Sequence, residues 1–179
     1  LVNRSITMLH RYFEGVVPAA EVDPAVAAAA EPMRQGFPAA VEELRFGAAL
    51  DLVWAFVGAL NKHIDDRAPW RLAKEGRQEE LAQTMYSLMD GIRLVALAVS
   101  PFMPEAAKEI WRQLGIAVPL DAQRWDEAML PGRLAAATVA AQPEPIFKRI
   151  EEQRAPAKKE KKMSEAAAPA PAPKPAEPE

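Results

Sequence analysis

The sequence contains no cysteine and only two histidines, His10 and His63, among its 179 residues. Without cysteine the chain forms no disulfide and offers no thiolate to a metal, which is typical of proteins in a reducing compartment. Two histidines far apart in sequence provide little material for a metal cluster or a Ser–His–Asp triad. We expect each histidine to be a surface or boundary residue, and we predict a cytoplasmic protein with no metal site.

Three further features are absent from the sequence. No apolar run reaches the roughly 18–20 residues that a membrane span requires. No glycine-rich phosphate-binding loop occurs. The formal net charge of −3 argues against nucleic-acid binding through a strongly basic surface. It is compatible with the recognition of a few unstacked bases, because that depends on stacking and local hydrogen bonds.

Helical periodicity dominates the first 115 residues. Apolar side chains recur every three to four positions over residues 1–13, which predicts a first helix. Asp23 as N-cap and Pro24 at the first helical position predict a second, alanine-rich helix, which we expect to end at Pro32 and Gly36.

The strongest periodicity predicts a helix of about eight turns that begins at Pro38. It should end before Pro69, because a residue that precedes proline disfavours the α conformation. Trp54, like Trp111 further on, is expected to be a core or near-core residue. The apolar stripe of this long helix comprises Phe46, Leu50, Val53, Val57, Leu60 and Ile64.

A short turn over residues 70–76 should lead into another helix over 78–99. Ser100 as N-cap and Pro101 at the first helical position then predict a helix that Gly115 ends. No β-alternation occurs before position 119, so the fold class is all-α, a helical bundle.

The remaining residues are less regular. Between residues 118 and 141 we predict irregular structure, with one short helix over 133–141, and we assign residues 1–142 to the bundle. Residues 143–152 form a short segment of their own. Residues 153–179 are low-complexity Ala, Pro, Lys and Glu, which predicts a disordered linker or tail. The chain starts at Leu1 inside a helical pattern, so we expect it to be a piece of a longer protein.

The stretch "NKHIDDRAPWRLAKE", residues 61–75, places the largest apolar side chain, Trp70, directly after a proline at a polar helix end. Either this tryptophan fills the end of the core or it presents a flat ring for stacking. The nearby carboxylates of Asp65 and Asp66 are more typical of a solvated helix end than of an acid–base pair, so we predict no catalytic residue here.

Three separated stretches resemble bacterial methionyl-tRNA synthetase: "LVNRSITMLHRYFEGVVP", "NKHIDDRAPWRLAK" and "PEPIFKRIE". They follow the family's order and spacing over nearly all of residues 1–151, in its C-terminal anticodon-binding half. A bare Pro-Trp pair is weak evidence, whereas three matches in register are specific. The resemblance implies the helical anticodon-binding bundle of class I aminoacyl-tRNA synthetases, and a partner that is methionine tRNA, bound at its anticodon loop.

The resemblance also implies which residues bind the anticodon. Trp70 matches the tryptophan that stacks on the first anticodon base, a cytosine, and Arg4 matches an arginine that faces the anticodon. Asn61 and Asp65 match supporting polar positions on one helix face, and Pro69 fixes the turn that aims Trp70. The family's anticodon-reading asparagine would fall just upstream of Leu1, and Asn3 does not match it.

The family's catalytic core, with its "HIGH" and "KMSKS" signatures, does not match these residues. ATP would be bound by that core, so this piece is expected to be non-catalytic although it belongs to an ATP-dependent ligase. "KKMSEA" in the tail lacks the second lysine and the final serine of the "KMSKS" loop. In the family, the "PEPIFKRIE"-like segment packs back toward the rest of the enzyme. Many members continue into a small dimerising β-barrel, so the parent would be a homodimer through a domain beyond these residues.

Two alternatives stay open at this point. One is a helical protein-interaction module with no nucleic-acid role. The other keeps the fold but assigns it to a valine, leucine or isoleucine synthetase.

Overall fold

The computed structural model describes residues 1–147, so the tail predicted over 153–179 lies outside the described residues. In this part of the chain the prediction of an all-α fold is confirmed. The only β pairing among residues 1–147 is an isolated antiparallel bridge between Val16 and Val139. The helices are α1 (Val2–Phe13), α2 (Pro24–Glu42), α3 (Phe46–Arg67), α4 (Pro69–Lys74), α5 (Gln78–Val99), α6 (Pro104–Gln113), the 3-10 turn η1 (Leu120–Ala122) and α7 (Trp125–Ala128).

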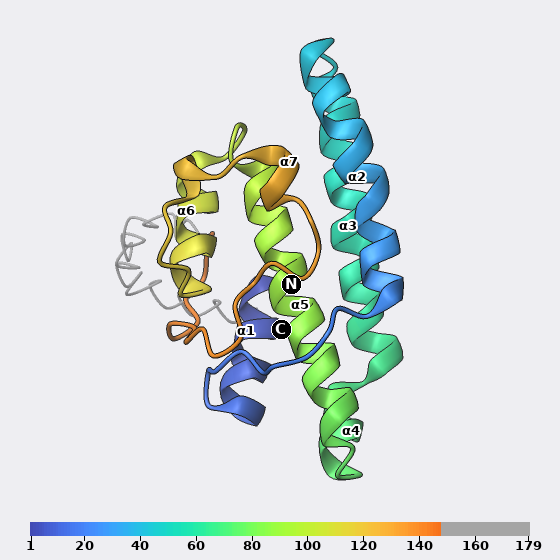
Figure 1. The fold of residues 1–179 in the computed structure, drawn as a ribbon, viewed down its shortest axis with the longest axis vertical. Coiled ribbons are helices and arrows are strands. Elements are labelled where there is room, and N and C mark those ends of the chain that lie inside the picture. Colours follow the sequence, from blue (N-terminus) through green and yellow to red (C-terminus); the bar gives the residue numbers. More distant parts are fainter. Residues whose placement is uncertain (148–179) are drawn as a thin grey trace, which may run out of the picture. The chain divides into compact units, whose positions relative to one another are not determined.

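Helix α5 is the centre of the bundle, and the other helices surround it (Figure 1). Its bounds, Gln78–Val99, are those that the sequence predicts. Every residue from 84 to 99 is buried, as expected for a helix that is covered on all sides. The other helices that pack against it are α1, α2, α3, α4, α6 and α7.

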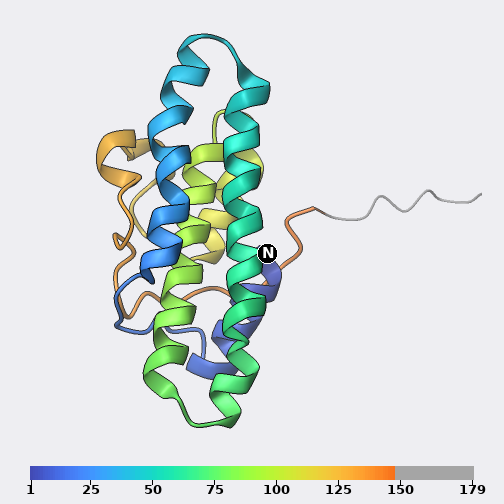
Figure 2. The same ribbon diagram turned by 90° about the vertical axis from the view of Figure 1, so that its right-hand side faces the viewer.

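Helices α2 and α3 form a long antiparallel hairpin beside α5 (Figures 1 and 2). The prediction that the second helix ends at Pro32 and Gly36 is wrong, because α2 continues to Glu42 through Pro32 and Pro38. Each internal proline removes one backbone hydrogen bond. A continuous apolar face packed inward offsets this loss: Val26, Ala30, Met33, Phe37 and Ala40 are all buried.

Helix α3 is shorter than predicted and buries a different face. It begins at Phe46, so it has about six turns instead of eight. Val53, Leu60 and Ile64 are buried as predicted, whereas Phe46 is 46% exposed. The prediction that Trp54 is a core or near-core residue is wrong, since 52% of its surface is exposed. The core position is taken by Phe56, because packing against both α2 and α5 turns that residue inward.

Three predictions for the chain after α3 are wrong. The turn predicted over residues 70–76 is largely helical, because the short helix α4 covers Pro69–Lys74. Helix α6 begins at Pro104 instead of Pro101, because Ser100 closes the end of α5, where its hydroxyl donates to the Leu97 carbonyl at 2.8 Å. The segment 133–141 is not helical: backbone bonds between Val17 and residues 137 and 138 tie it to the chain after α1.

Two tryptophans that follow α5 in the chain pack in or against the core. Trp111 is buried, as predicted, and its indole Nε1 donates to the Val118 carbonyl at 2.8 Å. Trp125 opens α7 and stacks on Phe37 of α2, with ring centroids 4.7 Å apart. Stacking of this kind fixes α7 against the hairpin.

A buried ion pair within α5 organises the segment that follows α7. Asp90 and Arg93 are 1% and 4% exposed, and Arg93 Nε donates to Asp90 Oδ1 at 2.8 Å. Asp90 also accepts the backbone amides of Gly132 at 2.6 Å and Leu134 at 3.0 Å. The guanidinium of Arg93 donates to the carbonyls of Ala128 and Leu130. Both charges are therefore paired and hydrogen-bonded, which is the condition for burying them.

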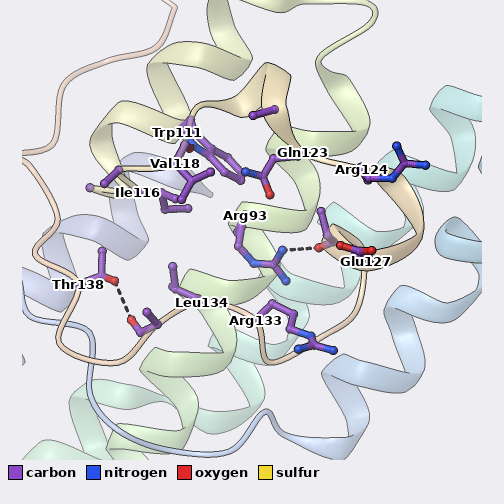
Figure 3. A pocket seen from close by; sticks show the side chains of 15 residues that line it. Arg93, Trp111, Ile116, Val118, Gln123, Arg124, Glu127, Arg133, Leu134 and Thr138 are labelled. Atoms are coloured by element: carbon purple, nitrogen blue, oxygen red, sulfur yellow. Dashed lines mark hydrogen bonds between the residues drawn. The ribbon is translucent and has the colours of Figure 1, made fainter.

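A cavity of about 840 Å³ lies beside this segment (Figure 3). Trp111, Ile116 and Val118 form an apolar wall, and Arg93 lies opposite. The guanidinium groups of Arg124 and Arg133 lie apart from each other in Figure 3 and do not converge on one ligand. None of the predicted site residues lines this cavity.

Within residues 1–147, no helix combines the length and the apolar character that crossing a membrane would require.

Candidate functional site

The α3–α4 junction presents the ring of Trp70. Helix α3 ends at Arg67, and Ala68 adopts a left-handed conformation (φ 45°, ψ 66°) while its amide donates to the Ile64 carbonyl at 2.9 Å. Pro69 then opens α4, where its missing N–H costs nothing. Pro69 is buried, whereas Trp70 is 48% exposed. Of the two roles that the sequence leaves open for Trp70, the geometry favours the presented ring.

Arg4 lies against this tryptophan and pairs with Asp65. The Cζ atom of Arg4 lies over the Trp70 ring, 5.6 Å from its centroid. Arg4 Nη2 donates to Asp65 Oδ1 at 3.2 Å. Helices α1, α3 and α4 therefore each contribute one side chain to a single cluster, although the sequence separates Arg4 from Asp65 by 61 residues.

The other two predicted residues lie at the edges of this cluster. Asn61 precedes Asp65 by one turn of α3, and its Nδ2 donates to the Val57 carbonyl at 3.0 Å. Pro69 lies beneath the surface, next to Trp70 in the chain. Arg4 thus connects two of the other predicted residues, Asp65 and Trp70, and the binding roles of all five stay predictions.

A second polar cluster ties the end of α3 to α2 and α5. Arg67 pairs with Asp23, the N-cap of α2, whose carboxylate also accepts the Ala25 amide at 2.9 Å. The Asp23 amide bonds Ser87 of α5 at 2.8 Å. Burial would raise the pKa of Asp23, but the bonds from Ala25 and Arg67 outweigh it, so this pKa lies below its ordinary value. Sequence reasoning identified Asp23 only as an N-cap, because nothing local indicates its link to Arg67.

His63 lies inside the α2–α3 contact and not at the surface. It is 8% exposed, so the expectation of a surface or boundary position is wrong. It lies near Val26 of α2 and Phe56 of α3, which are buried on the packed faces of these helices. Burial lowers the pKa of His63, and Arg67 acts in the same direction, while Asp23 and Asp66 oppose them. His10, by contrast, is half-buried in α1 and bonds the Ala141 carbonyl at 2.9 Å.

The buried His63 predicts a loss of stability in mild acid. In the unfolded chain its pKa is the ordinary 6.5, whereas the folded pKa is lower. As the pH falls through 6.5, the unfolded state therefore binds the proton first, and the free energy of unfolding declines until the folded pKa is reached. Urea unfolding from about pH 7.5 to about pH 5 measures this decline.

A matched variant assigns the effect to this side chain. We expect His63→Leu to unfold with a shallower pH dependence over the same range, because leucine has no proton to gain. An unchanged slope in His63→Leu would mean that other groups cause the loss. The lowered pKa of Asp23 stabilises the fold in a separate pH range, because this stabilisation is lost only as the pH falls below 3.8, the ordinary pKa of the group.

Residues 1–147 contain no cluster of three or more side chains that could hold a metal ion. The carboxylates of Asp65 and Asp66 are exposed, and their partners are the basic side chains of Arg4 and Lys62. The chemistry that this surface offers is an aromatic face, a guanidinium and a carboxylate.

Comparison with known proteins places the chain in a family. A family model described as the anticodon binding domain of methionyl tRNA ligase matches residues 19–166. The methionine–tRNA ligase of Caldanaerobacter subterraneus subsp. tengcongensis is 34% identical over 170 residues, which cover 92% of this chain and 26% of that protein. The Streptococcus pneumoniae ligase is 36% identical over 156 residues, covering 84% and 23%. The chain thus spans about a quarter of the length of these relatives.

Solved structures agree with the sequence matches. The apo form of Mycobacterium tuberculosis methionyl-tRNA synthetase superposes with a TM-score of 0.73 at 28% identity, over 84% of this chain and 31% of that one. The same enzyme bound by methionyl-adenylate gives a TM-score of 0.72, also at 28% identity, over 82% and 30%. The helical fold, the family match over most of the chain and the relatives point to one family. The chain belongs to the family of methionyl-tRNA ligase anticodon-binding domains.

Proposed function

We propose that this domain binds the anticodon loop of methionine tRNA, with Trp70 as the stacking platform for the first anticodon base. The observation that carries the proposal is the half-exposed Trp70 ring with Arg4 and Asp65 beside it. An unstacked base gains about 1–3 kcal/mol from an aromatic face of this kind. The planar guanidinium of Arg4 donates to a base edge or a phosphate.

The supporting residues have distinct tasks in this proposal. Pro69 holds the turn that presents Trp70, and Asp65 pairs with Arg4 in the free protein. Asn61 holds a polar edge one turn away on α3. A local site of this size is sufficient for a chain whose net charge is −3, because single-stranded bases are recognised by stacking and hydrogen bonds.

The longer protein that carries this domain would be an ATP-dependent methionine–tRNA ligase of the cytoplasm. The support is the set of relatives, of which this chain matches about a quarter, and the methionyl-adenylate bound by the Mycobacterium tuberculosis enzyme. ATP and methionine would bind to the part outside the matched quarter. A homodimer of the parent would form through a C-terminal domain outside this chain.

Residues 143–152 are proposed to pack against the rest of that ligase, as the resemblance of this segment to the family implies. Of this segment the structure describes 143–147, where Pro145, Ile146 and Phe147 line an apolar groove of about 350 Å³ with Leu1 and Trp54. Phe147 is 72% exposed. An aromatic side chain exposed at an apolar groove is typical of a surface that another part of the protein covers.

Binding of RNA hairpins tests the proposed function. At one fixed salt concentration, fluorescence anisotropy compares a hairpin that carries the methionine anticodon with a hairpin whose first anticodon cytosine is replaced by guanine. We expect the replacement to weaken binding by about tenfold, because a wrong base leaves polar groups of the site unpaired. Equal affinities would contradict anticodon recognition, and no binding of either hairpin would favour a protein-interaction module.

A further inference from the structure

Arg4 covers one face of the ring that is proposed to receive the anticodon base. Its Cζ atom lies 5.6 Å from the Trp70 centroid, over the ring. Stacked planar groups lie about 3.5 Å apart, so a base between Arg4 and Trp70 requires about 7 Å. The guanidinium and a base therefore do not fit on this face together at the observed spacing.

Asp65 keeps Arg4 in this position. The ion pair at 3.2 Å joins α1 to α3, and the guanidinium reaches Trp70 of α4 from there. The two side chains are 47% and 67% exposed. Exposed ion pairs of this kind are weak and exchange readily with water, so the contact opens without disturbing the bundle.

We propose that Arg4 is a displaceable cover on Trp70, and that Asp65 is the positioning residue that keeps the cover closed. On binding, the base replaces the guanidinium on the ring, and the released Arg4 turns to a phosphate of the anticodon loop. The inference rests on the proposed function. It adds that only the fraction of the free protein in which Arg4 has left the ring, the open fraction, can bind the base. The apparent Kd is therefore the intrinsic Kd divided by the open fraction.

A pair of asparagine variants tests the cover. Asp65→Asn removes the charge that holds Arg4, so the open fraction increases and the hairpin with the methionine anticodon binds more tightly. Removing any carboxylate also reduces repulsion of RNA, and Asp66→Asn controls for this effect. Asp66 is the next residue of α3, is similarly exposed and pairs with Lys62 at 2.6 Å. We expect Asp65→Asn to exceed Asp66→Asn by about two- to fivefold in affinity, in keeping with the strength of one exposed ion pair.

The same comparison in an Arg4→Gln background isolates the cover. Without the arginine there is nothing for Asp65 to hold, so the excess of Asp65→Asn over Asp66→Asn should disappear. Side-chain NMR adds a direct readout. The Arg4 δ-protons should be shifted upfield by the indole ring in the free protein, and this shift should be reduced in Asp65→Asn and lost when the hairpin binds.

The results distinguish failure of the Arg4 cover from failure of the proposed anticodon binding. Equal effects of the two asparagine variants, or an Arg4 ring-current shift that persists in the complex, would overturn the cover while anticodon binding stands. RNA affinity that is insensitive to the first anticodon base and to Trp70 would overturn the proposed function, and the cover with it.

Discussion

Trp70→Ala is expected to weaken binding of the methionine anticodon hairpin by about 1–3 kcal/mol, or roughly fivefold to 140-fold in Kd. The variant removes the aromatic face on which the first anticodon base would stack. Because Trp70 is 48% exposed, we expect the free energy of unfolding to change by no more than about 1 kcal/mol. Anisotropy gives the affinity, and urea unfolding gives the stability.

Trp54→Ala is the matched control. Trp54 is 52% exposed and lies on α3, but it lines the apolar groove near Phe147 and not the cluster around Arg4. Its removal should leave RNA affinity unchanged. Trp70→Phe should retain part of the affinity, since phenylalanine keeps a smaller stacking surface. If Trp70→Ala unfolds the bundle, the ring is part of the core. If both alanine variants weaken binding equally, the stacking site is not at Trp70.

Asp90→Ala is expected to lower the free energy of unfolding by about 3–5 kcal/mol, because it leaves the buried Arg93 without its counter-charge. The amides of Gly132 and Leu134 lose their acceptor in the same step. The expected cost is a large fraction of the stability of a domain. The midpoint of urea unfolding at neutral pH measures it.

Two further variants test whether burial of the ion pair causes this loss of stability. Glu105→Ala removes an exposed ion pair with Lys108 and should change stability by no more than about 0.5 kcal/mol. The double variant Asp90→Leu with Arg93→Met removes both buried charges and should recover part of the loss, although the loop amides stay unpaired. An Asp90→Ala variant as stable as Glu105→Ala would show that the pair does not hold the segment after α7.

Local sequence signals determined where several helices begin and end. The bounds of α5 follow from a continuous apolar pattern, and the end of α3 follows from the restriction that Pro69 places on the preceding residue. Asp23 caps α2 as the sequence predicts. The motif around Trp70, with two further stretches in register, was sufficient for the family, which the matches to methionyl-tRNA ligases confirm.

Only the tertiary structure decided which faces of the helices are buried and which distant side chains meet. Helix α2 runs through Pro32 because α3 covers its apolar face along its length. Phe56 is inside and Trp54 outside because α2 and α5 both pack on α3, and periodicity does not indicate the direction from which a partner approaches. Arg4, Asp65 and Trp70 each lie on a different helix. Their contact depends on how α1 and α3 pack, which no local propensity encodes.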